Sequence, residues 1–472
     1  MYFPKIFFLL ATAPIVFAKI QFLGVAIAGG DFGCQIDGSC PTGSTQLPLN
    51  NDGVSQMQHF VKDDGLNMLR LPISWQFLVN NKLGGDLDSG NLAKYDQLVQ
   101  ACLATGAHCM IDIHNFARWN GGIIGQGGPT DDQFVSLWTQ LATKYASNEN
   151  VVFELMNEPH DLDIGIWAQT CQKVVTAIRN AGATKQMILL PGTNFDSAAT
   201  LPMTGGGQQL LAIKNPDGTT DNLILDIHKY LDTDNSGTHA ECTTNNSGAF
   251  TALADFLRRN GRKGLISETG ASQDASCLNA FCAQNTLINQ NSDVFVGLVA
   301  WGAGSFDTSY VLSLTPSKQN GQLVDNKLMS QCVIAPWVNS KETNPRDGET
   351  STVVVTPSTR PATTITPTTF VTASAAKSSK SDEPVLTVHI LSDTSLVQTA
   401  SVPSSLTVLI TAPGAPNDNS YSIALATPTD TPAPVQTKPT TTTSPGPTAT
   451  GGASSIQITA LIWGCMLLPF LL

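Results

Sequence analysis

Short apolar runs alternate with longer amphipathic segments along residues 21–336. The short runs are rich in β-branched and aromatic residues, as buried strands are, and the longer segments repeat apolar residues at helical spacing. Strands that alternate with helices predict βα units and a parallel sheet. The runs expected to form strands are residues 22–27, 68–73, 109–113, 151–156, 187–190, 223–227, 264–267 and 294–300.

The amphipathic segments between these runs are the expected helices. Eight strands, each followed by a helix, are the number that closes a (β/α)₈ TIM barrel. The expected fold class is therefore α/β, with a TIM barrel spanning residues 19–340. Clear helical segments are residues 54–63, 92–105, 131–145, 164–180 and 249–260.

Two of the expected strands end in a glutamate. The stretch NVVFELMNEP (150–159) ends in Glu158, and KGLISETG (263–270) carries Glu268 at its tip. A parallel barrel gathers the carboxyl ends of its strands at one rim, where its chemistry lies. A single glutamate there is commonly a structural cap, but two on the same rim predict a catalytic pair. We interpret Glu154, inside the first of these strands, as structural.

Other polar and aromatic residues lie at the ends of the expected strands. Each has a structural explanation when taken alone, such as a buried histidine or an arginine paired with a core acid. Their convergence on one rim favours a functional site. These residues are Arg70, Trp75, His114, Asn115, Asn157, His228, Tyr230 and Trp301.

The residue types at this rim favour glycoside hydrolysis. That reaction needs one protonated carboxyl group to donate to the leaving oxygen and one ionised carboxylate. An arginine such as Arg70 would lower the pKa of a neighbouring glutamate, and Tyr230 could hold the same carboxylate. Trp75, Trp119 and Trp301 offer flat faces on which sugar rings stack. A serine hydrolase is disfavoured because no G-x-S-x-G motif occurs.

The net charge and the cysteines of the chain indicate which partners and which cellular environment to expect. The 472 residues carry 25 basic and 37 acidic side chains, a net charge of −12, which argues against a nucleic-acid partner. Residues 1–18 read as a secretory signal peptide. Nine of the ten cysteines lie between Cys34 and Cys332 without CxxC-type metal clusters, so we expect disulfides, one leftover thiol, no metal and no cofactor. Asn245 begins an N-glycosylation sequon.

The composition changes after residue 340. Residues 341–455 are dominated by Ser, Thr, Pro and Ala, and predict a disordered, O-glycosylated stalk; whether residues 386–410 fold is left open. Residues 456–472 are largely apolar and follow small residues, which fits a GPI-anchor signal. A transmembrane anchor is the alternative.

Several motifs together resemble glycoside hydrolase family 5, and within it the fungal endo-β-1,4-glucanases of the Trichoderma endoglucanase II type. The likeness covers residues 19–337. The motifs are RLPISW (70–75), DIHNFARWNGGIIGQGGPT (112–130), MNEPHD (156–161), DIHKYLD (226–232), SETG (267–270) and AWGAG (300–304).

The resemblance implies a retaining double displacement on β-1,4-glucan, with Glu158 as acid/base and Glu268 as nucleophile. It implies that four disulfides form and that Cys171 stays free. The other functional positions that it implies are Arg70, His114, Asn157, His228, Tyr230 and Trp301. The implied disulfides are Cys34–Cys40, Cys102–Cys109, Cys242–Cys277 and Cys282–Cys332.

The chain departs from those cellulases because nothing in it resembles a cellulose-binding module. We therefore expect a monomeric fungal enzyme that is secreted, tethered to the membrane or wall through its C-terminus, and active on accessible β-glucan. A β-mannanase, xyloglucanase or β-1,3-glucanase is the runner-up, since rim loops select the sugar. A non-catalytic glycan-binding surface glycoprotein is the alternative from another class.

Overall fold

The computed structural model describes residues 19–49 and 52–339. The expected signal peptide, stalk and anchor segment lie outside the described residues, so these domain assignments remain predictions. The described residues all belong to one unit of the chain, Met1–Val354.

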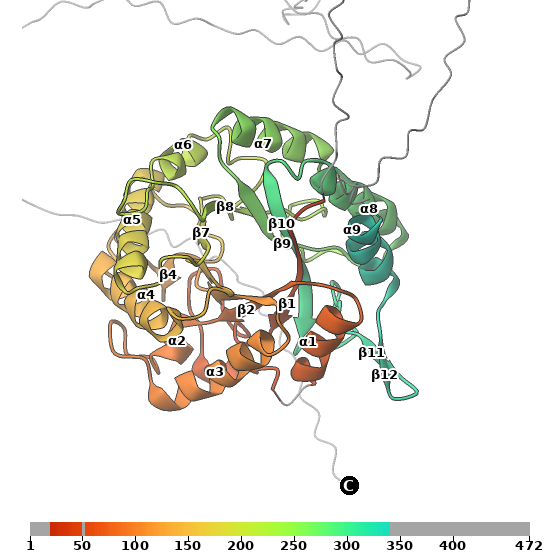
Figure 1. The fold of residues 1–472 in the computed structure, drawn as a ribbon, viewed down its shortest axis with the longest axis horizontal. Helices are drawn as coiled ribbons and strands as arrows, with labels where there is room; N and C mark the ends of the chain where they lie inside the picture. Colours follow the sequence, from red (N-terminus) through yellow and green to blue (C-terminus); the bar gives the residue numbers. More distant parts are fainter. Residues whose placement is uncertain (1–18, 50–51, 340–472) are drawn as a thin grey trace, which may run out of the picture. The chain divides into compact units, whose positions relative to one another are not determined.

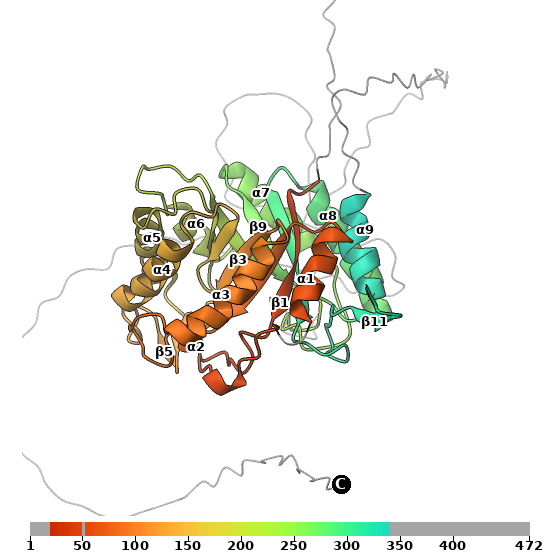
Figure 2. The ribbon, with the colours of Figure 1, turned by 60° about the horizontal axis from the view of Figure 1, so that its bottom comes forward.

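Within the described residues, eight parallel strands close into a barrel in the order β1-β10-β9-β8-β7-β6-β3-β2. Helices surround the strands as an outer ring (Figures 1 and 2). This confirms the expected (β/α)₈ barrel. The strands are β1 (Phe22–Ala28), β2 (Met68–Ile73), β3 (His108–Ile113), β6 (Val151–Glu154), β7 (Ile188–Leu190), β8 (Leu223–His228), β9 (Gly264–Thr269) and β10 (Phe295–Gly304).

Side-chain caps fix where several helices of the outer ring begin. Thr130 forms a capping box with Gln133 at the start of α4, and Asp163 caps α5. The expected helices 131–145 and 164–180 match α4 and α5 at both ends. The helices are α1 (Gly53–Lys62), α2 (Trp75–Leu78), α3 (Ser89–Leu103), α4 (Asp131–Tyr145), α5 (Ile164–Asn180), α6 (Gly206–Leu211), α7 (Ser247–Arg259), α8 (Ala275–Gln290) and α9 (Ala335–Val338).

Alternate residues of each barrel strand pack into different cores, because a strand points successive side chains to opposite faces. Leu69 and Leu71 of β2 join the large core between strands and helices. Met68 joins a separate cluster inside the barrel. That inner cluster, the amino-end plug, consists of Phe22, Met68, Met110, Val152, Leu189, Ile224, Leu265 and Val299.

Strand ends differ from the prediction mainly at the functional rim. The strand expected at 151–156 ends at Glu154, because the chain then leaves the sheet and Glu158 adopts a left-handed φ of 46°. The strands expected at 264–267 and 294–300 instead run on to Thr269 and Gly304. Polar residues at the carboxyl ends of these two strands continue the hydrogen bonding between strands. Apolar content alone does not predict that such residues belong to a strand.

Short elements and disulfides complete this unit. The pairs β4 (Arg118–Trp119) with β5 (Gly122–Ile123), and β11 (Ser317–Gln319) with β12 (Gln322–Val324), form small antiparallel sheets. A 3₁₀ turn, η1 (Thr42–Ser44), and a π-helical turn, η2 (Met329–Ile334), are also present. The disulfides in the described residues are those that the resemblance implies, and Cys171 is buried and free. They are Cys34–Cys40, Cys102–Cys109, Cys242–Cys277 and Cys282–Cys332.

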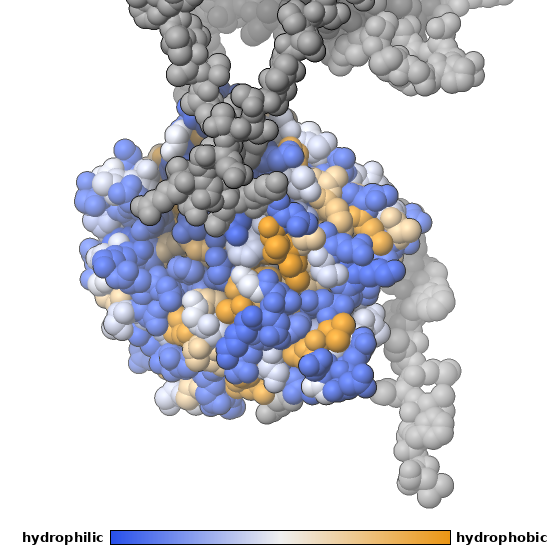
Figure 3. Space-filling view, turned by 45° about the vertical axis from the view of Figure 1, so that its right-hand side comes forward, coloured by the Kyte–Doolittle hydropathy of each residue, from blue (hydrophilic) through white to orange (hydrophobic). Residues whose placement is uncertain are grey.

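The outer surface is mainly hydrophilic. On the face in Figure 3, apolar side chains form separate patches among polar ones. In the described part of the chain, no helix is both long enough and apolar enough to cross a membrane. Asn245, the predicted glycosylation residue, is exposed just before α7.

Candidate active site

The two predicted catalytic glutamates meet at the carboxyl ends of the strands. Glu268 lies near the end of β9, and Glu158 lies in the loop that follows β6. One carboxylate oxygen of Glu158 and one of Glu268 lie within 4.8 Å of each other. Barrel closure therefore brings together two carboxyl groups that lie 110 residues apart in the chain.

Glu268 is held as an ionised carboxylate. Arg70 Nη1 forms a short ion pair with its Oε2, and the Tyr230 hydroxyl donates to its Oε1 at 2.7 Å. Burial alone would raise the pKa of Glu268, but the charges of Arg70, His228 and His114 and the Tyr230 hydrogen bond outweigh burial. They lower the pKa of Glu268 to about 2.

Glu158 occupies a different environment. Its side chain is 17% exposed, against 7% for Glu268, and its Oε1 lies 2.9 Å from Nδ1 of His228. Its backbone N–H donates to the Asp196 carboxylate at 3.0 Å, which holds the left-handed backbone in place. The two glutamates thus differ in both solvent access and partners.

Arg70 is fully buried and organises the carboxyl half of the barrel interior. It donates to both oxygens of Glu154, at 2.7 and 2.6 Å, and to Asn157 Oδ1 at 2.8 Å. Asp112 Oδ2 lies 2.8 Å from Arg70 Nη2. Glu154, interpreted from the sequence as structural, therefore orients the arginine that contacts Glu268.

Histidines flank this network on both sides. His114 Nδ1 lies 2.7 Å from Asp112, and although burial lowers the pKa of His114, Asp112 raises it to about 9. His228 is also buried, which lowers its pKa, but the charge of Glu268, the carboxylate of Glu154 at 3.8 Å and the hydrogen bond to Glu158 raise that pKa well above the usual range. Both imidazoles add positive charge near the carboxylates.

Trp301 lies beside this site, whereas Trp75 does not. The Trp301 ring stacks on His114 with centroids 5.7 Å apart, and its Nε1–H donates to the Tyr310 hydroxyl at 3.2 Å. Trp75, predicted as a sugar-stacking residue, has no exposed surface. It begins α2, and its ring packs against Phe134 in the strand–helix core, so this prediction is wrong.

Trp119 and Asn115, two further predicted rim residues, both contact Trp75. Trp119 is partly exposed and packs edge-on against Trp75 at 5.3 Å. Asn115 is buried and accepts the backbone N–H of Trp75 at 2.7 Å, which makes it a loop-bracing residue. A groove of about 510 Å³ beside His114 is lined by Phe32, Phe306 and polar loop residues.

Sequence reasoning missed the acids that support the glutamates. Asp196 lies in a loop after β7, where no strand pattern marked it. Asp112 and Asp226 each precede a rim histidine by two residues, in the repeated tripeptide DIH. Because strand side chains alternate, this repeat was a usable signal that each aspartate faces the same interior as its histidine.

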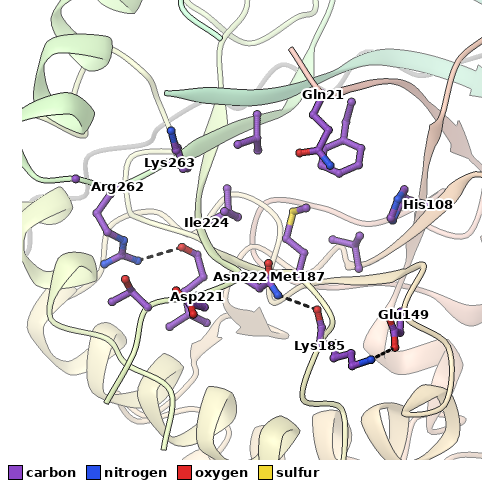
Figure 4. A pocket seen from close by; sticks show the side chains of 16 residues that line it. Gln21, His108, Glu149, Lys185, Met187, Asp221, Asn222, Ile224, Arg262 and Lys263 are labelled. Carbon is purple, nitrogen blue, oxygen red and sulfur yellow. Dashed lines mark hydrogen bonds and ion pairs between the residues drawn. The ribbon is translucent and has the colours of Figure 1, made fainter. Parts of the chain in front are cut away.

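A second cavity, of about 440 Å³, opens at the amino ends of the strands (Figure 4). Its basic side chains are already engaged, since Lys185 contacts Glu149 at 2.5 Å and Arg262 and Lys263 donate to the backbone carbonyls of Leu223 and Asp293. Its floor is the apolar amino-end plug. We therefore assign no chemistry to this end.

Histidine and carboxylate groups that could hold a metal occur at four places in the described residues. At the active site, the positive charges of Arg70, His228 and His114 lie near Glu268 and oppose the binding of a metal ion there. The four groups are Glu158, His228 and Glu268; Glu154, Asp226 and His228; Asp232, Asp234 and His239; and His59, Asp64 and Asp325.

Comparison with known proteins agrees with this geometry. Residues 34–304 match the family described as Cellulase (glycosyl hydrolase family 5). The chain is 57% identical over 323 residues to Endoglucanase EG-II of Hypocrea jecorina, covering 66% of this chain and 77% of that protein. It is 47% identical over 298 residues to Manganese dependent endoglucanase Eg5A of Phanerodontia chrysosporium, covering 62% and 75%.

A solved structure has the same fold. The crystal structure of Cel5A (EG2) from Hypocrea jecorina aligns with a TM-score of 0.66 and 57% identity, covering 67% of this chain and 99% of that one. The family match spans more than half of the present chain. The chain therefore belongs to glycosyl hydrolase family 5, the cellulase family.

Proposed function

We propose that this chain is an endo-β-1,4-glucanase that hydrolyses internal bonds of β-glucan by a retaining double displacement. The family and the endoglucanase relatives support the activity. The observation that carries the mechanism is the pair Glu158 and Glu268, with carboxylate oxygens within 4.8 Å and unlike surroundings. Retaining enzymes place their carboxyl groups about 5–5.5 Å apart, and inverting enzymes about 6.5–9.5 Å apart.

In the first step, the ionised Glu268 attacks the anomeric carbon and forms a glycosyl ester. Arg70 and Tyr230 hold the attacking carboxylate in one orientation. Glu158 gives its proton to the leaving glycosidic oxygen, so the C–O bond breaks without releasing an alkoxide.

In the second step, water attacks the glycosyl ester. Glu158, now a carboxylate, takes the proton from this water, and Glu268 leaves as a carboxylate. His228 contacts Glu158 and steers its side chain. The Nδ2 of Asn157 is buried and has no protein partner among the described residues, so it can donate to a sugar hydroxyl beside the reacting carbon.

Sugar binding is assigned to the rim beside these groups. Trp301 presents an aromatic ring next to Arg70, whose guanidinium carbon lies 5.7 Å from the ring centroid. The groove beside His114 extends this surface toward Phe32 and Phe306. Rings of this kind stack on the C–H faces of pyranoses.

The decisive experiment measures reducing-sugar release from carboxymethylcellulose by the purified full chain. We expect Glu158→Gln and Glu268→Gln each to lower kcat by about 10²–10⁴-fold or more. Activity that survives both changes would overturn the site assignment. Proton NMR of fresh product should show the β-anomer first, and an initial α-anomer would mean inversion.

Parallel assays on mannan, xyloglucan and laminarin test the sugar. Faster hydrolysis of one of these would keep the two-glutamate mechanism and replace the substrate. Binding to glycans without any hydrolysis would instead favour the surface glycoprotein.

We also propose that the enzyme is secreted, monomeric, glycosylated at Asn245 and tethered through its C-terminus. The signal-like residues 1–18, four disulfides, the sequon and the apolar residues 456–472 support this. Release of cell-bound activity by a phosphatidylinositol-specific phospholipase would identify a GPI anchor. Retention after that treatment, with release by detergent, would identify a transmembrane segment.

We propose that no metal ion takes part in either chemical step of the reaction. Eg5A is named a manganese dependent enzyme, but in this chain the positive charges of Arg70, His228 and His114 lie near Glu268 and oppose a cation beside it. Each proton transfer above uses only Glu158. We therefore route no step of the reaction through a metal ion.

A further inference from the structure

One histidine and three aspartates meet on the outside of the barrel, where α1 contacts the hairpin of β11 and β12. His59 lies in the last turn of α1, and Asp63 and Asp64 follow that helix directly. Asp325 follows β12, 266 residues from His59. The hairpin lies beside α1 in both ribbon views (Figures 1 and 2).

The distances among these side chains fit a coordination shell. His59 Nε2 lies 3.5 Å from Asp64 Oδ2 and 3.3 Å from Asp325 Oδ1, and the three ligand atoms lie within 4.8 Å of one another. Ligands held about 2.0–2.1 Å from a tetrahedral ion are about 3.3 Å apart. Asp64 Oδ2 is buried and accepts no hydrogen bond from any residue within 19–49 or 52–339.

The fourth side chain sets the tautomer of the imidazole. Asp63 Oδ2 lies 2.8 Å from His59 Nδ1, so Nδ1–H donates to this carboxylate. In the neutral ring, Nε2 then carries the lone pair, and it faces Asp64 and Asp325. A carboxylate that orients a histidine in this way is the usual outer-shell partner of a metal-bound imidazole.

Three carboxylates surround the single imidazole of His59. The salt bridges of these three carboxylates in the described residues all go to this one imidazole. Asp64 and Asp325 are only 12% and 10% exposed, and they lie past the C-terminus of α1, where the helix dipole is itself negative.

We propose that His59, Asp64 and Asp325 bind a divalent transition-metal ion, with Asp63 as the outer partner of His59. One imidazole nitrogen and two carboxylate oxygens suit Mn²⁺ or Zn²⁺, which accept mixed nitrogen and oxygen ligands, better than Ca²⁺, which prefers oxygen alone. The ion clamps the hairpin to α1. This site goes beyond the proposed function and does not depend on it.

The test is metal binding to the full-length protein after treatment with EDTA and exhaustive dialysis. Titration with Mn²⁺ or Zn²⁺, followed by calorimetry or by loss of the free-Mn²⁺ EPR signal, should reveal one saturable site per chain. Bound metal should raise Tm, since it binds only the folded site. Calcium is expected to bind at least tenfold more weakly than the preferred ion.

Three substitutions locate the site. Asp325→Asn and Asp64→Asn should each weaken binding by more than tenfold, and Asp63→Asn should weaken it by about 10- to 100-fold through the orientation of His59. Asp52→Asn is the matched control. Asp52 pairs with Lys318 of the same hairpin but lies outside the ligand set, so metal affinity should stay unchanged.

The inactive Glu268→Gln enzyme separates this site from the catalytic one, and it should bind the ion as the parent does. Absence of saturable Mn²⁺ and Zn²⁺ binding by the parent overturns the proposal. So does binding that survives Asp325→Asn, or that is lost in Glu268→Gln. If Asp325→Asn lowers Tm equally with and without metal, His59 is a protonated clamp and the proposal is also wrong.

Discussion

Met68 and Arg70 lie two residues apart on β2 and both face the inside of the barrel, yet their surroundings differ completely. Met68 packs with apolar side chains of the amino-end plug. Arg70 is surrounded by Glu154, Asp112 and Glu268. The same change occurs on β3 between Met110 and Asp112.

The difference teaches how one barrel separates stability from chemistry. The amino-end plug fills one half of the interior with apolar side chains. Burial away from water and close packing stabilise these side chains, which need no hydrogen-bond or ionic partners. The carboxyl half buries charges, which is costly unless each is paired. Its pairing through Arg70 keeps Glu268 ionised, so the half of the barrel that buries charge is the half to which we assign the chemistry.

The largest expected effect comes from Arg70→Met. Removing one partner of a buried charge network should lower the free energy of unfolding by about 3–5 kcal/mol and abolish measurable hydrolysis. Urea unfolding and reducing-sugar assays measure both. Met68→Leu, the control in the other half, should cost less than about 1.5 kcal/mol and leave kcat unchanged. A fully active Arg70→Met enzyme would contradict the assignment of the chemistry to the carboxyl half of the barrel.

The pH dependence of stability should also come from the carboxyl half. The folded pKa of Glu268, about 2, lies below the unfolded value of about 4.3. The contribution of ionised Glu268 to the free energy of unfolding is therefore fully present above about pH 4.3. It is lost as the pH falls through about 2. Urea midpoints measured from pH 5 to pH 2 should fall more steeply for the parent than for Glu268→Gln. Parallel slopes would show that Glu268 carries no such contribution.

Tyr230→Phe should have an intermediate effect. It removes a hydrogen bond to a charged acceptor, worth about 1.5–3 kcal/mol, so kcat should fall about 10- to 100-fold. The acid limb of the kcat/KM profile should shift to higher pH, because Glu268 loses a donor that lowers its pKa. A smaller kcat with an unshifted acid limb would mean that the hydroxyl positions substrate instead.

The smallest expected effects are those of substituting Trp301 and Trp75, and the two substitutions should change different quantities. Trp301→Phe should raise KM about two- to tenfold, since a stacked aromatic contact contributes about 0.5–1.5 kcal/mol. Trp75→Phe should leave KM unchanged and lower only Tm, because Trp75 is fully buried. A raised KM for Trp75→Phe with unchanged Tm would restore a sugar-stacking role for that residue.

Patterns within a few residues were enough to predict the barrel. Alternation placed strands and helices, and α4 and α5 were predicted to the residue. The carboxyl-end rule placed Glu158 and Glu268 on one rim. The same rule failed for Trp75, because Ser74 caps α2 and the chain turns the next side chain into the strand–helix core.

The sequence by itself determined which residues lie at strand ends, because strand and helix periodicity and capping are local. Only the tertiary structure decided which of them touch. Arg70 reaches Glu154 across 84 residues and Glu268 across 198, and His59 meets Asp325 across 266. Such contacts depend on barrel closure and on packing between distant elements, which no local pattern encodes.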